Sequence, residues 1–499
     1  MSAPYILGID QSTSGTKALL FDKEGAVLGR SDLLHRQYYP QPGWVEHDPD
    51  EIYRNTLGAA KRLLDGAGID RGKVAALALT NQRETALVWD RRTGEPVHNA
   101  VVWQCRRGEA ICRNLEAQGM AEGIKEKTGL VLSPYFSAAK IGWILDHVDG
   151  ARERAQRGEL ACGTMDSWLV WKLTGGAVHA TDYSNASRTQ LFNLKRLGWD
   201  AGLLDAFGIP ASMMGDIRCS DEEFGRTDLE GMLPRAVPIL GVMGDSHAAL
   251  FAQNCYVPGS AKATYGTGSS VMMNIGSKPL ESSGGLVTSV AWGMQRKVEY
   301  VFEGNINSSG DTVQWLVDGL DLIQSAKEAG IIAASVPDTQ GVYLVPAFVG
   351  LSAPYWDSGA RAAILGMSRG TKKAHVVRAA EESMAYQIRD ILDLMVKESG
   401  MALSELRADG GPTKDSFLMQ FQADILGLPV SPSALEELSA AGAAYMAGIA
   451  VGVWADREAL RSLRRSGPAY RPAMPKTQAD SLYGGWRAAV RRTLTGADR

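Results

Sequence analysis

The 499-residue sequence lacks the features of a secreted, membrane or nucleic-acid-binding protein. Its five cysteines are scattered without CxxC spacing, so neither a disulfide framework nor a zinc site is indicated, and a reducing cytoplasm is the expected location. The longest apolar run, residues 440–455, is too short to span a bilayer comfortably and is expected to form a tightly packed internal helix. The net charge is -4 and no Lys/Arg block stands out, so no nucleic-acid or membrane partner is expected.

The sequence also lacks several motifs by which nucleotide-binding enzymes are recognised. It has no GxxxxGK[ST] P-loop, no HRD or DFG set, and no GxGxxG after a first strand. Its length exceeds what one hydrophobic core usually supports, so two or three domains with room for a cleft are expected. If the chain binds phosphate, we expect paired loops to hold it.

Two stretches, far apart in the sequence, share one pattern. An apolar run over residues 5–10, a hydroxyl-rich turn over 11–17 and a second apolar run predict strand, turn and strand. The pattern recurs over residues 260–275. Either stretch alone could be an ordinary Ser/Thr/Gly hairpin, but such turns also direct N–H and hydroxyl groups at phosphate. The repetition favours two domains of related design, each presenting a loop to one ligand, with a boundary near Ala252.

The segments between these units alternate between helical and strand patterns. Capping residues predict a helix over 48–64, and apolar runs predict strands over 74–79 and 85–89. A helical apolar period extends over residues 375–397. Strands alternating with helices indicate an α/β layered fold.

Two acids follow apolar runs. Asp10 lies at a predicted strand end beside the first hydroxyl-rich turn, where it could hold a hydrated Mg²⁺ or simply cap the turn. Asp245 follows the apolar run 239–244 and could accept a proton from a substrate hydroxyl, although a helix N-cap is the simpler alternative. His247 is expected to be neutral and hydrogen-bonded rather than catalytic.

Other polar and aromatic residues could bind a polyol. Arg83 and Glu84 place a fork of donors beside a carboxylate, which suits vicinal hydroxyls, although a surface turn is the alternative. Trp103 and Tyr135 could supply flat faces for a carbon chain or belong to the core.

The chain resembles the FGGY carbohydrate kinases, and among them the glycerol kinases, over essentially its full length. The matching stretches are residues 9–13, 42–49, 80–85, 103–107, 180–182, 184–188, 265–268, 353–357 and 409–411. The resemblance implies an α/β, two-domain ribonuclease-H-like (actin-like ATPase) fold. It places an active-site cleft between a polyol-binding domain over 1–252 and a nucleotide-binding domain over 253–499.

The resemblance also implies the reaction and the residues that perform it. The expected activity is transfer of the ATP γ-phosphoryl group to a primary hydroxyl of glycerol or a small polyol or sugar, with Asp245 as general base and Mg²⁺ at Asp10. The implied acceptor-binding residues are Arg83, Glu84, Trp103, Tyr135, Asp245, Ser246 and Ser270. The implied ATP-binding residues are Thr13, Ser14, Lys17, Thr267, Gly310, Gln314, Gly411 and Asp415. We expect a homodimer or homotetramer.

Five positions depart from the glycerol kinase pattern, and one of them is His247, which stands with Ser246 where that pattern has two Gln residues. Lys17 stands where Arg is common, and Asp415 stands where Asn is usual. Ser246 and Ser270 replace Gln and Phe, which shortens two side chains that close the polyol pocket. One hypothesis is therefore a four- or five-carbon polyol or ketose substrate. Alternatives from other classes are an actin-like nucleotide switch and a sugar sensor without activity.

Overall fold

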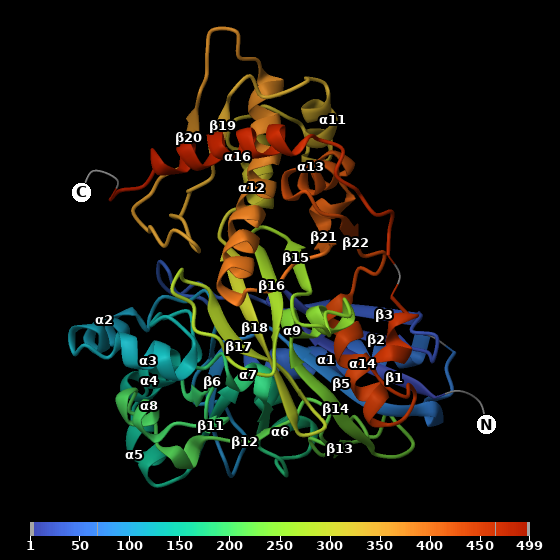
Figure 1. The fold of residues 1–499 in the computed structure, drawn as a ribbon. Helices are drawn as coiled ribbons and strands as arrows, with labels where there is room; N and C mark the ends of the chain where they lie inside the picture. The colour runs from blue at the N-terminus through green and yellow to red at the C-terminus, as the bar shows by residue number, and fades with distance from the viewer. Residues whose placement is uncertain (1–3, 67, 465, 497–499) are drawn as a thin grey trace.

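The computed structural model describes residues 4–66, 68–464 and 466–496, and it contains two lobes, each built around a six-stranded sheet (Figure 1). Residues 1–3 and 497–499, at the outer ends of the two predicted domains, lie outside the described residues. The broad lobe contains the blue and green segments of Figure 1, and the narrower lobe contains most of the orange segments. The prediction of an α/β fold with two domains is confirmed.

The first sheet has the strand order β13-β14-β5-β1-β2-β3. Its strands are β1 (Tyr5–Gln11), β2 (Gly15–Phe21), β3 (Val27–Leu34), β5 (Val74–Asn81), β13 (Arg226–Thr227) and β14 (Val237–Gly244). Strand β1 forms an antiparallel hairpin with β2 and pairs in parallel with β5, which in turn pairs in parallel with β14. The carboxyl ends of β1, β5 and β14 therefore meet at one edge of the sheet.

The second sheet has the order β17-β18-β16-β15-β21-β22. Its strands are β15 (Ala261–Tyr265), β16 (Ser269–Gly276), β17 (Val287–Met294), β18 (Lys297–Ile306), β21 (Leu406–Gly410) and β22 (Val430–Pro432). As in the first sheet, an antiparallel hairpin, β15 with β16, is flanked by the parallel strand β21. The two predicted strand–turn–strand units are thus confirmed as equivalent hairpins.

Helices cover both sheets. They include α1 (Pro49–Gly66), α9 (Asp245–Ala252), α10 (Gly310–Asp318), α11 (Ala329–Ala334), α12 (Lys373–Ser399), α13 (Ser416–Leu426), α14 (Leu438–Ala450) and α16 (Lys476–Arg491). Helix α1 packs on β2 and β3, whereas α10, α11 and α13 pack on α12. The helices predicted near 48–64 and 375–397 are confirmed, and a short strand, β19 (Tyr343–Val345), packs on α12.

A smaller α/β region extends the broad lobe. Its four-stranded sheet has the order β4 (Glu46–His47), β7 (Ala100–Val101), β6 (Ala86–Asp90) and β8 (Leu160–Thr164). Its helices are α2 (Glu109–Ala117), α3 (Ala121–Thr128), α4 (Ser137–His147), α5 (Ala151–Gln156), α6 (Met165–Leu173), α7 (Tyr183–Ala186) and α8 (Ala201–Ala206). This region carries the aromatic residues of the candidate site.

Helix α14 comes late in the chain but packs on the first sheet and on α9 (Figure 1). It is rich in alanine and glycine, and nearly all of it is buried. A side chain at Gly442 would collide with the carbonyl oxygen of Ala248 in α9. Close backbone approach therefore explains the small residues, as expected for an internal helix. The predicted domain boundary near Ala252 stays a prediction.

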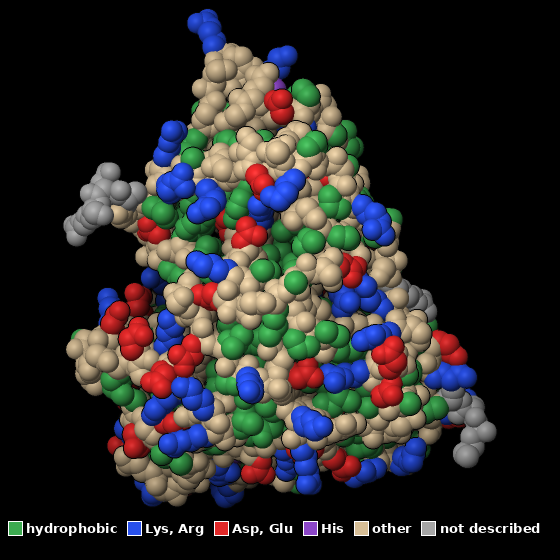
Figure 2. All heavy atoms as spheres, in the orientation of Figure 1, with side chains coloured by type: hydrophobic (Ala, Val, Ile, Leu, Met, Phe, Trp, Pro, Cys, Tyr) green, Lys and Arg blue, Asp and Glu red, His purple; other side chains and the backbone are tan. Residues whose placement is uncertain are grey.

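Two further expectations concern the surface and the cysteines. Acidic and basic side chains are interspersed on the face shown in Figure 2. None of the helices in the described part of the chain is long and apolar enough to cross a membrane. All five cysteines are free and buried.

Candidate active site

Asp245 lies where β14 passes into α9. Gly244 precedes the helix in an extended conformation, so Asp245 occupies the first turn rather than the N-cap. Its side chain is 34% exposed, and its Oδ1 lies 3.2 Å from Nε of Arg83. A carboxylate on a rigid strand–helix junction, partly open to solvent, is positioned to accept a proton from a bound molecule.

Four charged side chains form a buried group beside Asp245, here called the acceptor cluster: Arg83, Glu84, Arg188 and Glu303. Arg83 donates to both carboxylate oxygens of Glu303, each over 2.9 Å. Arg188 donates to Glu84 over 2.6 Å and lies 2.9 Å from Glu303. Each residue is at most 7% exposed, so the surface-turn interpretation of Arg83 and Glu84 is wrong. Buried charges of this kind persist because they are paired.

The protonation state of Glu303 follows from these partners. Burial alone would raise the pKa of Glu303, but Arg188 and Arg83 outweigh it and hold that pKa far below its usual range. Glu303 and its two arginine partners therefore stay charged at neutral pH. The cluster joins the two lobes, because Arg83 and Arg188 belong to the broad lobe and Glu303 to β18 of the second sheet.

Aromatic side chains border the site on the broad lobe. The rings of Trp103 and Tyr135 lie 5.6 Å apart in an edge-to-face arrangement. The Trp103 indole N–H donates to the hydroxyl of Thr13 over 2.9 Å, which joins this wall to the first hydroxyl-rich turn. The buried Lys140 ammonium donates to the carbonyl oxygens of Pro134, Tyr135 and Phe136 and so fixes the segment that carries Tyr135.

Ser246, His247 and Ser270 surround Asp245 and the acceptor cluster. The Ser270 hydroxyl donates to Glu303 over 3.2 Å, and the Ser246 amide donates to Asp245 over 2.6 Å. His247 is fully buried with Nε2 3.2 Å from the Ser289 hydroxyl. Burial and nearby Arg83 hold the pKa of His247 well below its usual value, so this ring is neutral, as expected.

The two hairpin turns form similar loops. In the first, the Ser12 amide and hydroxyl both bond the Gly15 carbonyl, leaving Thr13 and Ser14 at the tip. In the second, Gly266 N–H bonds the Gly268 carbonyl. The Thr267 carbonyl accepts the amide of Ser309, so this loop is tied to the start of α10, where Gly310 lies.

Asp10 lies at the end of β1 beside the first loop. It is 5% exposed, and its Oδ1 has no hydrogen-bond partner among the residues that the structure describes. Burial raises the pKa of Asp10 to about 7, with Lys17 lowering it and Asp245 raising it further. Lys17 lies 3.9 Å from Asp10 but is bonded to Glu437 at 2.7 Å. One free carboxylate oxygen among hydroxyl groups fits a magnesium ion that keeps most of its waters.

A cavity of ≈ 1020 Å³ lies between α10, α11, α12 and α13 and is called here the α12 cavity. Three of the predicted nucleotide residues, Gly310, Gly411 and Asp415, line it. Gln314 is not part of this lining, because its amide turns to Asp318 on the same helix over 2.7 Å. The volume is at the upper end of ligand pockets and is ample for a nucleotide.

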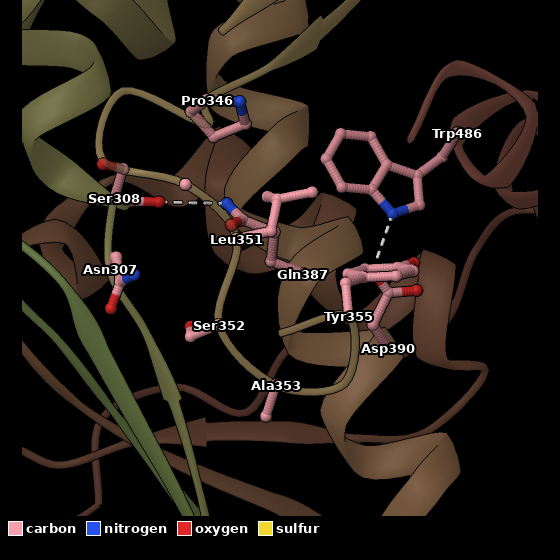
Figure 3. A pocket seen from close by; sticks show the side chains of 11 residues that line it. Asn307, Ser308, Pro346, Leu351, Ser352, Ala353, Tyr355, Gln387, Asp390 and Trp486 are labelled. Atoms are coloured by element: carbon pink, nitrogen blue, oxygen red, sulfur yellow. Dashed lines mark hydrogen bonds between the residues drawn. The ribbon is translucent and has the colours of Figure 1, made fainter. Parts of the chain in front are cut away.

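A second, small cavity lies behind the loop 350–357 (Figure 3). Asp390 on α12 accepts hydrogen bonds from Tyr355, Tyr483 and Trp486 and anchors that loop against α16. The volume is only ≈ 10 Å³, about that of one water molecule. This cavity supports the loop and has no room for a substrate.

Sequence models of the FGGY family of carbohydrate kinases match the chain in two parts. The N-terminal domain of the family matches residues 5–252, and the C-terminal domain matches residues 261–451. The chain therefore belongs to the FGGY family of carbohydrate kinases, phosphotransferases with an alcohol group as acceptor.

Relatives with high identity are similar along the whole chain. "Glycerol kinase 1" of Thermotoga maritima is 53% identical over 98% of this chain and 100% of its own length. A glycerol kinase of Carboxydothermus hydrogenoformans is 52% identical over 99% of this chain and 98% of its own. The crystal structure of Plasmodium falciparum glycerol kinase with ADP has a TM-score of 0.93 and 36% identity, covering 99% and 98% of the two chains. These relatives confirm the resemblance stated from the motifs.

Two members of the acceptor cluster, Arg188 and Glu303, were not among the predicted site residues. Glu303 follows Val301-Phe302 in a buried strand. A charge in such a strand is costly unless it is paired, which is the signal that could have identified it. Its partners lie far away in the sequence, however, so the pairing itself required the fold.

Proposed function

We propose that this protein transfers the γ-phosphoryl group of ATP to a primary hydroxyl of glycerol. The observation that carries the proposal is Asp245, a partly exposed carboxylate 3.2 Å from Arg83 of the acceptor cluster. The names of the relatives with about half of their residues identical support glycerol as the acceptor.

Different residues bind the two substrates: one group binds and deprotonates the acceptor, and another binds ATP. Asp245 accepts the proton of the acceptor hydroxyl as its oxygen forms a bond to the γ-phosphorus, while the bond from the γ-phosphorus to the β,γ-bridging oxygen breaks and ADP leaves. Arg83 orients the Asp245 carboxylate. The carbon chain of the acceptor rests against Trp103 and Tyr135, and Arg83 and Glu84 meet its other hydroxyls. Positioning carries most of the rate, because phosphoryl transfer requires little covalent chemistry from a protein.

The phosphates of ATP lie between the two hairpin loops. Thr13, Ser14 and Lys17 contact them from the first loop and Thr267 from the second, while the nucleoside occupies the α12 cavity beside Gly310, Gly411 and Asp415. Gln314 contacts the nucleotide only if it leaves Asp318. Asp10 would hold Mg²⁺, which would neutralise phosphate charge when bound.

A larger acceptor is a second candidate. Ser246 and Ser270 lie beside Asp245 and Glu303, at positions where glycerol kinases carry longer side chains. Both short side chains leave more room, and the Ser270 hydroxyl adds a hydrogen-bonding group where Phe has none, which favours a four- or five-carbon polyol or ketose.

A coupled assay of ATP consumption tests both candidates. Glycerol is compared with tetritols, pentitols and ketopentoses at equal concentration, and we expect glycerol to give the highest kcat/KM. Preference for a longer acceptor by a large factor would overturn glycerol in favour of the second candidate. ATP consumption that needs no added acceptor would instead indicate a nucleotide switch. A cytoplasmic location and a homodimeric or homotetrameric state remain predictions.

A further inference from the structure

Glu437 precedes helix α14 but does not cap it. It occupies the N-cap position, where a side chain often accepts a hydrogen bond from the first turn, yet its carboxylate accepts none from the helix. One oxygen, Oε2, instead lies 2.7 Å from Nζ of Lys17, and the other, Oε1, lies 2.6 Å from Nη1 of Arg30. Two cations of the broad lobe therefore share this carboxylate, which is only 13% exposed.

The fold places these charged groups on one face of the first sheet. Lys17 in β2 pairs across from Asp10 in β1. Arg30 in β3 pairs across from Leu19, two residues after Lys17 in β2. Paired residues, and residues two apart in one strand, direct their side chains to the same face, and Leu19 packs there in one hydrophobic cluster with α14. Glu437, at the start of α14, therefore reaches Lys17 although 420 positions separate them.

Lys17 has a second carboxylate within reach. Its Nζ lies 3.9 Å from Oδ2 of Asp10, too far for a hydrogen bond, and Oδ1 of Asp10 has no hydrogen-bond partner among the described residues. Without Glu437, the flexible lysine chain could bring its ammonium onto Asp10. An ion pair there would occupy both charges that the proposed function needs, the Asp10 carboxylate for Mg²⁺ and the Lys17 ammonium for phosphate.

We propose that Glu437 is a positioning residue for nucleotide binding: it holds the Lys17 ammonium apart from Asp10 and leaves it free to bind the phosphates. A lysine ammonium has three donors, and the bond to Glu437 uses one of them. Arg30 binds the second oxygen of Glu437 and so keeps the carboxylate in place. The proposal rests on the proposed function in one respect, the contact between Lys17 and a phosphate.

The neighbouring Glu436 provides a matched control. It pairs with Lys414 at 2.8 Å, but both side chains are at least 66% exposed, so this ion pair contributes little. Glu436→Gln removes the same charge as Glu437→Gln, one residue away, and leaves the bond between Glu437 and Lys17 in place. An effect that comes only from the net charge of this segment would appear in both variants.

Calorimetric binding of ADP with Mg²⁺, without any acceptor, tests the proposal. Lys17→Met is expected to weaken ADP binding about tenfold or more, because a charged hydrogen bond to phosphate is lost. Glu437→Gln should weaken ADP binding by about three- to tenfold, whereas Glu436→Gln should change it by less than about twofold. Unchanged or tighter binding by Glu437→Gln overturns the proposal, because an acid that does not position a cation only repels the nucleotide.

A double-mutant cycle determines whether Glu437 acts through Lys17. In the Lys17→Met background there is no ammonium to hold, so Glu437→Gln should weaken ADP binding by less than about twofold further. An equal loss in both backgrounds overturns the proposal, because Glu437 would then act independently of Lys17. If Glu437→Gln does not fold, as judged by its melting curve, Arg30→Gln decides. That variant frees one oxygen of Glu437, so ADP binding should weaken by about two- to fivefold, and unchanged binding overturns the proposal.

Failure of this inference can be distinguished from failure of the proposed function. Weaker ADP binding by Lys17→Met, normal binding by Glu437→Gln and glycerol-dependent ATP consumption together overturn the role of Glu437 alone. ADP binding that does not depend on Lys17 overturns both the inference and the placement of the phosphates at the first loop. The expected cycle without acceptor-dependent ATP consumption supports the inference and overturns the kinase proposal.

Discussion

The two ends of the candidate site, the acceptor cluster and the α12 cavity, each contain a buried glutamate, and the pKa values of these two glutamates are shifted in opposite directions. Glu303 and Glu381 are both glutamates with at most 3% exposure. Glu303 is held by two arginines, so its pKa lies far below the usual range. Among the described residues, no cation is paired with Glu381, and burial raises its pKa to about 8. The glutamate of the acceptor cluster is therefore ion-paired, whereas the glutamate beside the α12 cavity is not. The partners of a carboxyl group, more than its burial, decide what it can do.

This difference matches the two tasks that the proposed function assigns to the ends. Phosphoryl transfer to an alcohol requires a base with a fixed orientation. Arg83 is held on both sides, by Glu303 at its two Nη atoms and by Asp245 at Nε, so it can orient the Asp245 carboxylate. Binding of a nucleoside requires an apolar enclosure with a few matched polar atoms. The predictions below test whether the two ends differ in this way.

The largest effect is expected for Asp245→Asn, which replaces the carboxylate proposed to accept the proton by an amide that is not basic. We expect kcat to fall by about 10²- to 10⁴-fold while the KM for the acceptor changes little, because an amide still accepts and donates hydrogen bonds. The melting temperature should stay near that of the wild type, since the side chain is 34% exposed. Steady-state kinetics and a thermal melt measure both quantities, and retained turnover would refute the assignment of the base.

A comparison of Glu303→Gln with Glu381→Gln tests directly whether the first glutamate stabilises the fold through its ion pairs and the second does not. Glu303→Gln leaves Arg83 and Arg188 without a counter-charge, so it should lower the free energy of unfolding by about 3–5 kcal/mol at pH 7. Glu381→Gln replaces a neutral acid by an amide of the same shape, so its effect should stay below about 1 kcal/mol. Urea unfolding measures both, and equal losses would contradict the contrast.

The pH dependence of the Glu303→Gln effect has a definite sign. The folded pKa of Glu303 lies below the ordinary value of 4.5, so its stabilising contribution is complete above pH 4.5 and is lost as the pH falls toward the folded pKa. The difference in unfolding free energy between the wild type and Glu303→Gln should therefore shrink between pH 5 and pH 3. A difference that grows on acidification would mean that the arginines do not hold Glu303 in its ionised form.

Local patterns in the sequence were sufficient to predict the strands and turns that carry Asp10, Asp245 and the two hydroxyl-rich loops. The apolar runs before Asp10 and Asp245 specified strands that end at the same sheet edge, because parallel strands share their direction, and the hydroxyl-rich turns were confirmed as equivalent hairpins. Arg83 and Trp103 were identified from composition and motif. These features depend on neighbours within a few residues, which a sequence displays directly.

Long-range pairing could not be read in the same way. The Arg83–Glu303 pair joins residues that are 220 positions apart, and nothing local in β18 specifies its partner. Glu381 and Glu382 look alike in the helical pattern of α12, and only the packing of α11 and α13 on that helix leaves one carboxyl unpaired beside a cavity. The run in α14 predicted a buried helix but not that it covers the first sheet.

The smallest effect is expected for Trp103, whose indole N–H joins the aromatic wall of the site to the first hydroxyl-rich turn. Trp103→Phe keeps an aromatic wall but removes the N–H that donates to Thr13, so we expect a loss of about 0.5–1.5 kcal/mol in transition-state stabilisation, a two- to tenfold fall in kcat/KM. Trp199→Phe is the matched control, because its indole N–H donates to the Gly215 carbonyl over 2.8 Å outside the site. Both variants should lose similar stability, but only Trp103→Phe should lose activity. Equal kcat/KM in the two variants would mean that the Trp103–Thr13 bond supports the fold and does not position the loop for the reaction.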